Sequence, residues 1–419
     1  MSKSPPKIPD NPVSRREFLW KSFLGLGLAA SAPSLFLQGC GDSHPKTSNL
    51  ANLGPLKGPD ENGLMLPEGF TSRILARSGE IVPGTDYVWH GAPDGGAVYE
   101  HGSGWIYVSN AETPTVLGFP GGAGALVFNA KGEIVDAYRI LTDTEINCAG
   151  GPTPWGTWLS CEEIDAGRVW ECDPTKPSQG TPYPALGVFK HEAAAVDPET
   201  FQVYLTEDQS DGNFYRFTPA SKTSERADFS EGKLEVAVVE GDLESGEGDL
   251  HVTWVELPNP SPDIEANETP TRHQIPEATV FRRAEGAAYR DGIVYFATTS
   301  DNRVWALETA TDRLTVIYDA DRITDGVRLT GVDNLVITSS GDVVIAEDNG
   351  SPNCGIGAVL PSGEVVELVR VTDQPGSEIT GPAFDPSQTR LYFSSQRGQT
   401  DKPFFESGIT YCIEGPFFV

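Results

Sequence analysis

The stretch from His191 to Asp208 reads HEAAAVDPETFQVYLTED and contains two short apolar segments joined by a turn rich in Asp and Pro. Apolar and polar residues alternate along the second segment, and the turn residues disfavour a continuous strand, so the stretch predicts a β-hairpin. The two ends of a hairpin lie side by side. We therefore expect Glu192, at the opening, to lie near Glu207 and Asp208, at the close.

The same pattern recurs in five other places, with a polar or acidic residue before the first strand and another after the second. These stretches are DGGAVYEHGSGWIYVSNAE from Asp94, GPTPWGTWLSCEE from Gly151, EGAAYRDGIVYFATTSD from Glu285, DNLVITSSGDVVIAED from Asp333 and TGPAFDPSQTRLYFSSQR from Thr380. Repeated hairpins, each followed by further strand-like segments, predict an all-β fold, a six-bladed β-propeller with loop excursions. We interpret residues 217–280, the longest interval, as outer strands with a surface excursion; a separate small domain is the alternative.

The start of the chain has the features of an export signal. Arg15 and Arg16 precede an apolar run, FLGLGLAASAPSLFL, that is interrupted by Gly and Pro. The arginine pair resembles a twin-arginine signal, and LFLQGC at the end of the run resembles a lipoprotein processing site with Cys40 as the lipidated residue. We therefore predict contact with the twin-arginine export machinery, location in the periplasm or at the cell surface, and membrane attachment through a lipid on Cys40.

These features divide the chain into three parts. Residues 1–40 are the predicted signal, residues 41–60 a flexible tether, and residues 61–419 a single propeller domain. The formal net charge of the sequence is −30 at pH 7, which argues against nucleic acid as a partner. An excess of carboxylates can serve solubility, and it can also bind hard cations such as calcium.

The hairpin argument gathers many of these carboxylates at one end of a central channel. The candidate metal ligands are Glu112, Cys148, Glu162, Glu192, Asp208, Glu285 and Asp348; Asp94, Glu163 and Asp333 are expected nearby, with Arg283. So many like charges repel one another unless cations neutralise them. Carboxylates suit calcium, and a thiolate among carboxylates suits a transition metal such as iron. The alternative is that these residues only cap exposed strand ends.

Five cysteines follow residue 40, which is an odd number. In an oxidising compartment, disulfides Cys161–Cys172 and Cys354–Cys412 would leave Cys148 as a thiolate. Other pairings remain open at this point.

Several motifs resemble the PhoX-type alkaline phosphatases, a family formerly of unknown function. They are NCAGGPTPWGTWLSCEE from Asn147, FKHEAAAVD from Phe189, RRAEGAAY from Arg282, DNL from Asp333 and TGPAFDP from Thr380, and the likeness extends over about residues 60–415. The resemblance implies an exported six-bladed propeller with ferric iron, calcium and an oxo bridge at the channel mouth. It also implies a phosphoric monoester hydrolase that acts on small phosphorylated substrates.

The resemblance assigns roles to individual residues. Cys148 matches the iron-bound cysteine of the family, Glu192 and Glu285 match metal-binding glutamates, and Arg283 matches a phosphate-binding arginine.

One family motif differs in this chain. Its Asn-His-Glu strand end is Asn110-Ala111-Glu112 here, so Asn110 is expected to contact phosphate and Glu112 to bind metal, while the histidine is absent. Two alternatives to a phosphatase are a calcium-dependent, lactonase-like hydrolase and a non-catalytic surface propeller that metals stabilise.

Overall fold

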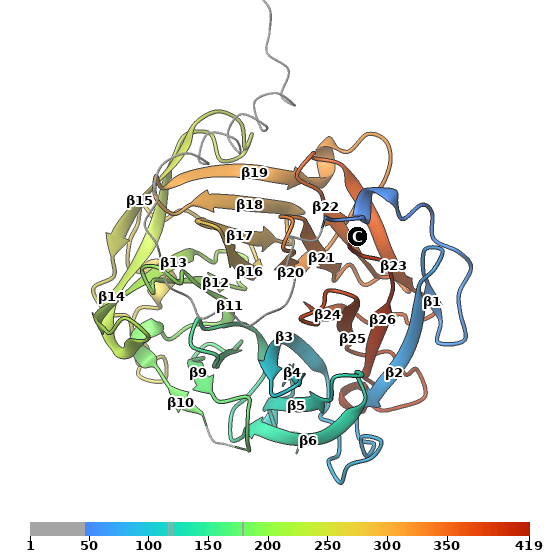
Figure 1. Cartoon of the computed structure of the whole chain (residues 1–419). Helices are drawn as coiled ribbons and strands as arrows, with labels where there is room; N and C mark the ends of the chain where they lie inside the picture. The colour runs from blue at the N-terminus through green and yellow to red at the C-terminus, as the bar shows by residue number, and fades with distance from the viewer. Residues whose placement is uncertain (1–46, 116–117, 119, 178–179) are drawn as a thin grey trace, which may run out of the picture.

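The computed structural model describes residues 47–115, 118, 120–177 and 180–419. The predicted export signal, Cys40 and the start of the predicted tether lie outside these residues. The described chain is all-β apart from 3-10 turns, and its sheets are arranged around a central axis as in a propeller (Figure 1). In this part of the chain, no helix has the length and hydrophobicity needed to span a membrane.

The strands form five hydrogen-bonded sheets, three of which contain four strands. The first consists of β3 (Pro93–His101), β4 (Gly104–Ala111), β5 (Gly122–Phe128) and β6 (Ile134–Leu141). The second consists of β7 (Asn147–Pro152), β8 (Trp158–Glu162), β9 (Val169–Cys172) and β10 (Thr181–Pro182). The third consists of β24 (Ile379–Phe384), β25 (Arg390–Ser395), β26 (Ile409–Glu414) and β2 (Thr71–Arg77), so a strand from near the start of the described chain completes the last sheet.

The two remaining sheets are larger. One has five strands: β20 (Val332–Ile337), β21 (Val343–Glu347), β22 (Gly355–Val359), β23 (Val365–Val371) and β1 (Leu64–Met65). The other has nine, in the order β11 (His191–Val196), β12 (Val203–Glu207), β13 (Phe214–Lys222), β14 (Ala227–Glu240), β15 (Leu250–Glu256), β19 (Arg313–Asp319), β18 (Arg303–Glu308), β17 (Ile293–Thr298) and β16 (Ala284–Arg290).

All six predicted hairpins are present, but they do not form six separate sheets. The third and fourth hairpins, β11–β12 and β16–β17, belong to the nine-stranded sheet, because β15 pairs with β19 at Leu250 and Leu314. The interval 217–280 contains the outer strands β14 and β15 and a loop excursion. The sequence pattern therefore located the inner hairpins, while the pairing between outer edges was not visible in it.

The first strand of each hairpin lies innermost, and each of these strands contacts the innermost strand on either side, which gives a closed ring of β3, β7, β11, β16, β20 and β24. Small residues let these strands approach one another closely. A Cβ atom added to Gly95 would lie 2.5 Å from the Cα atom of Ala149, and one added to Gly286 would lie 2.7 Å from that of Asn334. The cavity between the innermost strands at these glycines has a volume of only about 30 Å³, room for about one water molecule.

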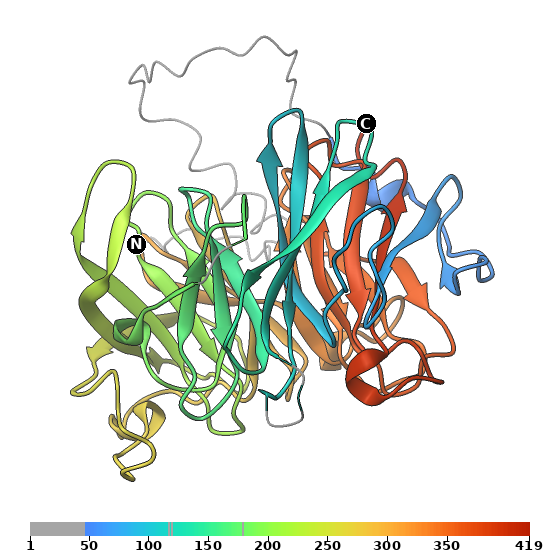
Figure 2. The same cartoon turned by 90° about the horizontal axis from the view of Figure 1, so that it is seen from below.

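The two ends of the ring differ in what they carry. The innermost strands all begin at the same end, and β25 therefore ends there. The described termini meet at the opposite end, where the Thr47 N–H donates to the Val419 carbonyl and the Ser48 N–H donates to Ser340 Oγ. Figure 2 shows the C-terminus at that end and the short turn after residue 400 at the other.

The predicted disulfides are wrong for this structure, in which Cys148, Cys161, Cys172, Cys354 and Cys412 are all free and buried. Cys161 and Cys172 lie on the adjacent strands β8 and β9 but on opposite faces of their sheet. Cys161 packs with Leu159 and Val169, whereas Cys172 packs with Trp158. Cys354 and Cys412 belong to different core clusters.

Candidate metal centre

A β-bulge interrupts the pairing of every innermost strand close to its start. The interrupted intervals are Pro93 to Gly96, Asn147 to Gly150, His191 to Ala194, Ala284 to Ala287, Val332 to Leu335 and Thr380 to Ala383. A bulge redirects side chains relative to the regular ladder. The first residues inside the bulges are Asp94, Cys148, Glu192, Glu285, Asp333 and Gly381. Five of the six strands thus place a potential metal ligand at the same level of the ring.

A second set of side chains follows the other strand of each hairpin. In each case, the N–H after that strand donates to the carbonyl of the residue just ahead of the innermost strand. The donor–acceptor pairs are Glu112–Ala92, Glu163–Ile146, Asp208–Lys190, Thr299–Arg283, Asp348–Gly331 and Gln396–Glu378, at 2.6–3.3 Å. This bond holds four carboxylates beside the bulge residues. In the fourth and sixth hairpins the equivalent residues are Thr299 and Gln396.

Residues of these two sets, together with Glu378, form four groups whose ligand atoms lie within 4.8 Å of one another. The groups are Asp94–Glu112–Cys148, Cys148–Glu163–Glu192, Glu192–Glu285–Asp333 and Asp333–Asp348–Glu378. Consecutive groups share a residue, so we call the whole set the acidic arc. The structure brings five predicted metal ligands into it, namely Glu112, Cys148, Glu192, Glu285 and Asp348.

Glu162 does not belong to the acidic arc, and Glu163 takes its place. Adjacent residues of a strand point to opposite faces. The Glu162 carboxylate accepts hydrogen bonds from the Glu145 N–H at 3.0 Å, the Arg168 N–H at 3.2 Å and Trp170 Nε1 at 2.8 Å. These contacts fix the turns around β8, which is a structural role.

Two other glutamates repeat this arrangement. Glu207 accepts from Tyr215 Oη at 2.7 Å and pairs with Arg272, and Glu347 pairs with Arg370. Glutamates at the last position of the second strand therefore hold surrounding loops, and the following residue faces the channel mouth.

Asn110 lies behind the acidic arc and is fully buried. Its amide nitrogen donates to the carbonyls of Cys148 and Ala149 at 3.0 and 2.7 Å, and its oxygen accepts from Trp158 Nε1 and Ser160 Oγ, both at 2.9 Å. All its hydrogen-bonding groups are engaged within the protein, so the predicted contact with phosphate does not fit this geometry. Asn110 instead holds the backbone at the Cys148 bulge.

Arg283 and Asp208 form an ion pair at the edge of the acidic arc. Arg283 Nε donates to Asp208 Oδ1 at 2.9 Å, and Arg283 Nη2 lies 2.9 Å from Glu285 Oε1. The Arg283 side chain remains 39% exposed. Its φ of 52° places the residue in the left-handed region, at the turn just ahead of β16. Asp208 thus serves here as a partner of Arg283 and is in none of the four groups found among the described residues.

Three further polar residues, one in the acidic arc and two beside it, were not predicted as site residues. Gln396 Nε2 donates to Asp94 Oδ2 and Glu112 Oε2, both at 2.5 Å, and Arg397 Nη1 lies 2.6 Å from Glu378 Oε1. The sixth hairpin ends in SSQR, so the signal for Gln396 and Arg397 was their position after the second strand. Glu378 precedes the sixth hairpin repeat, which begins at Thr380, so its position in the sequence did not mark it as a site residue.

Burial and mutual repulsion dominate the electrostatics of the acidic arc. Burial, followed by the charge of Glu112, raises the pKa of Asp94 to about 7. Burial also raises the pKa values of Glu192, Glu285 and Asp333 well above their usual range, and neighbouring carboxylates add to the effect. Burial and mutual repulsion therefore favour the protonated forms of these groups when no cation is bound.

Cys148 is affected in the same way. Burial, followed by the charge of Asp94, raises the pKa of its thiol well above the usual range, and its Sγ donates to Glu192 Oε1 at 3.3 Å. The thiolate predicted from the sequence therefore requires a nearby cation.

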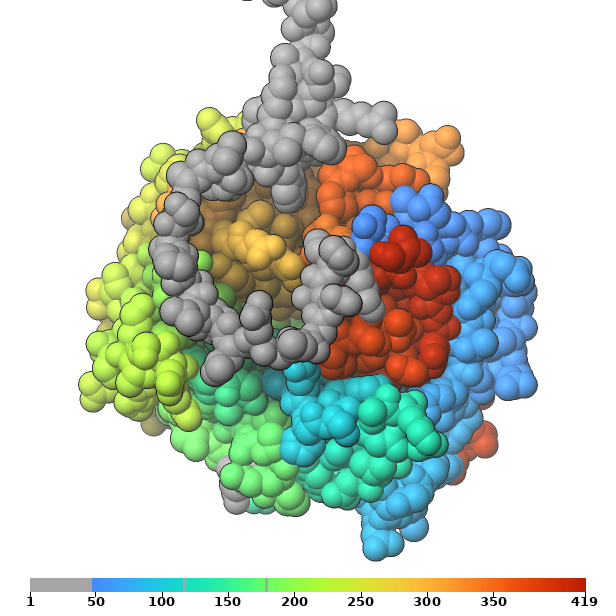
Figure 3. Space-filling model, viewed as in Figure 1, coloured from blue at the N-terminus to red at the C-terminus, as the bar shows by residue number. Residues whose placement is uncertain are grey.

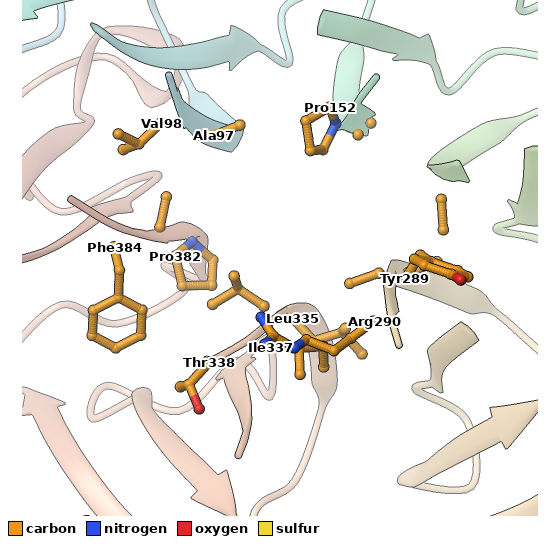
Figure 4. A pocket seen from close by; sticks show the side chains of 18 of the residues that line it. Ala97, Val98, Pro152, Tyr289, Arg290, Leu335, Ile337, Thr338, Pro382 and Phe384 are labelled. Atoms are coloured by element: carbon orange, nitrogen blue, oxygen red, sulfur yellow. The ribbon is translucent and has the colours of Figure 1, made fainter. Parts of the chain in front are cut away.

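The opposite end of the ring contains a cavity of about 430 Å³ with a mixed polar and apolar lining. The space-filling view shows this face hollowed at its centre (Figure 3). The side chains around the cavity include Ala97, Pro152, Leu335, Ile337 and Pro382 (Figure 4). Its lining includes one carboxylate, Asp385, and none of the four metal-ligand groups found among the described residues lies there.

Comparison with known proteins gives a specific match. The sequence model of the family "Alkaline phosphatase PhoX" matches residues 109–398. The solved structure of Pseudomonas fluorescens PhoX in complex with vanadate, a transition state analogue, is similar with a TM-score of 0.69 and 18% identity, covering 86% of this chain and 97% of that chain.

Two further solved structures match with lower TM-scores. A gluconolactonase from Xanthomonas campestris has a TM-score of 0.42 and 10% identity over 87% of this chain and 98% of its own. Regucalcin from Agrobacterium tumefaciens, a calcium-binding protein, has a TM-score of 0.41 and 12% identity over 82% of this chain and 95% of its own. None of the curated proteins compared with this sequence matches it. Because the family match covers more than half of the sequence, the chain belongs to the alkaline phosphatase PhoX family of phosphomonoester hydrolases.

Proposed function

We propose that this protein hydrolyses phosphomonoesters at metal ions bound by the acidic arc. The observation that carries this proposal is the continuity of the arc, in which four groups of three ligands share members around one end of the ring. The family assignment supports the same reaction. Arg283, half-exposed beside the arc, is the cation that would meet the substrate.

The residues of the acidic arc fit the metals implied by the family. Glu192 Oε2 is buried and has no hydrogen-bond partner among the described residues, as expected for an atom that ligates a cation. The groups that contain Cys148 combine sulfur with carboxylates and suit ferric iron, whereas the Asp333–Asp348–Glu378 group offers only oxygen and suits calcium. When bound, such ions act as Lewis acids toward phosphoryl oxygens.

The protein's own side chains would bind and orient the substrate. The guanidinium of Arg283 is planar and can offer two parallel N–H donors to phosphate oxygens. Asp208 holds Nε of that guanidinium at 2.9 Å and so fixes its direction. Asn110 would not contact the substrate and would act indirectly, because it holds the backbone that carries Cys148.

We further propose that the fold is a six-bladed propeller, with the nine-stranded sheet counted as two blades that share an outer edge. The six innermost strands and their equivalent bulges support this count. We also keep the proposals of twin-arginine export, location in the periplasm or at the cell surface, and lipid attachment at Cys40. Because Thr47 lies at the end of the ring opposite the acidic arc, such an anchor would leave the channel mouth open.

The test is activity and metal content of the purified protein. We expect iron and calcium by elemental analysis, and hydrolysis of p-nitrophenyl phosphate that a calcium chelator abolishes. Arg283→Ala should abolish hydrolysis without a large change in Tm. Arg290→Ala, at the cavity on the opposite end of the ring, is the matched control and should retain activity. A metal-loaded protein that is inert to phosphoesters, or one that hydrolyses a lactone instead, would refute the proposal.

A further inference from the structure

The acidic arc is open at one place, and Arg397 closes it. The bulge residue of β24 is Gly381, which contributes no side chain, and none of the four groups found among the described residues joins Glu378 at one end to Asp94 and Glu112 at the other. Arg397 Nη1 lies 2.6 Å from Glu378 Oε1, and Arg397 Nη2 lies 3.5 Å from Glu112 Oε2. One guanidinium therefore links the two ends of the arc.

Arg397 also holds an exposed aromatic ring. Its guanidinium carbon lies 4.5 Å from the ring centroid of Phe404, within the range of a cation–π interaction. Phe405 packs edge-on against the same ring at 5.0 Å. Phe404 is nonetheless 57% exposed. Both phenylalanines belong to the 3-10 turn Phe404–Glu406, which lies between β25 and β26 at the end of the ring that carries the acidic arc.

The surroundings of Phe404 favour a binding role over a packing role. A singly exposed phenylalanine is common on protein surfaces, but this ring lies against the Arg397 guanidinium, which itself contacts Glu378 and Glu112 of the acidic arc. Its position is fixed on one side by a guanidinium that is itself anchored to two carboxylates. A rigid aromatic surface beside a polar site suits a flat, apolar part of a ligand.

We propose that Phe404, positioned by Arg397, contacts the leaving group of the substrate and gives the enzyme a preference for phosphoesters with aromatic leaving groups. This inference rests on the proposed phosphatase function, since the phosphoryl group must bind at the acidic arc. Arg397 acts as a positioning residue, and Phe404 sets the specificity.

Binding of two stable phosphonates to the metal-loaded protein tests the proposal without turnover. Calorimetry should show that phenylphosphonate binds roughly 2- to 10-fold more tightly than methylphosphonate, the range expected from one aromatic contact. Phe404→Ala should remove this preference and leave methylphosphonate binding unchanged. Val135→Ala, an exposed apolar residue on β6, is the control and should keep the preference. Phe404→Leu, which keeps an apolar side chain, should give an intermediate ratio.

Arg397→Lys tests the positioning role. Lysine keeps the charge but lacks the planar group that stacks on the ring, so the ratio of the two affinities should fall toward one while methylphosphonate still binds. Equal affinities in the unaltered protein, or an unchanged ratio in Phe404→Ala, would overturn the role of Phe404. An unchanged ratio in Arg397→Lys would overturn that of Arg397. If neither phosphonate binds, the phosphatase proposal itself fails, together with this inference.

Discussion

Two neighbouring glutamates, Glu162 and Glu163, should show opposite effects when each is changed to glutamine. Glu163 shares a group with Cys148 and Glu192, so Glu163→Gln removes a charged ligand. Changes even to residues behind a metal ligand lower affinity about 10- to 100-fold, and the loss here should be at least as large. Burial and the charge of Glu112 raise the pKa of Glu163 well above its usual range, so the metal-free Glu163→Gln protein should be no less stable than the unaltered protein.

Glu162→Gln should leave metal content unchanged and lower stability. The carboxylate accepts three hydrogen bonds, and a glutamine side chain has a single acceptor oxygen, so at least one buried donor loses its partner. The cost is roughly 1–3 kcal/mol, which lowers Tm by on the order of 2–6 °C. Elemental analysis and thermal melting with and without chelator measure both effects. Loss of metal from Glu162→Gln but not from Glu163→Gln would refute the assignment of these two side chains.

Three further predictions concern the buried interior. Asn110→Ala removes four hydrogen bonds and should destabilise the protein by roughly 3–5 kcal/mol and weaken any thiolate-to-iron absorption band, since Cys148 loses its backbone support; retention of both Tm and the band would contradict this. In chelator, Tm should fall as the pH rises from 5 to 8. Between the ordinary pKa of Asp94, 3.8, and its raised pKa of about 7, the folded state holds more protons than the unfolded state. The free energy of unfolding therefore falls across that whole interval by on the order of 4 kcal/mol. A Tm that rises between pH 5 and pH 8 would contradict this sign. Finally, five thiols of residues 47–419 should react with a thiol reagent in denaturant without prior reduction, and fewer would indicate a disulfide.

Much of the ring could be predicted because the hairpin pattern carries positional information. Cys148, Glu192 and Glu285 lie at the start of hairpins. A residue at the start of an innermost strand reaches the channel mouth regardless of the register between that strand and its partner. At the closing end, a shift of one residue turns a side chain to the other face of the sheet. The bulges decide which face each side chain takes, and no sequence pattern showed them, which is why the sequence could not separate the roles of Glu162 and Glu163.

Other errors have the same origin in side-chain direction. Counting cysteines says nothing about which face of a sheet each occupies, and Cys161 and Cys172 face opposite cores. Asn110 was placed at phosphate because of its family motif, whereas its position within β4 directs it toward the backbone of β7. Arg397 was overlooked because the sixth hairpin has no acidic residue at its opening or its close, so it attracted no metal-site argument.

The charge balance of the acidic arc leads to a last prediction, that metal binding releases protons. Among the residues that the structure describes, nine carboxylates lie in or beside the arc, and three cations contact them. The carboxylates are Asp94, Glu112, Glu163, Glu192, Asp208, Glu285, Asp333, Asp348 and Glu378, and the cations are Lys190, Arg283 and Arg397. Protons make up part of this difference in the metal-free protein, because burial raises the pKa values of most of these carboxyl groups and of Cys148. Cations replace those protons when they bind. Calorimetric titration of calcium at pH 7 in buffers of different ionisation enthalpy should therefore give apparent enthalpies that vary with the buffer, in the direction of proton release. Enthalpies independent of the buffer would mean that the arc is already ionised without metal, and that the fold tolerates this charge by some other route.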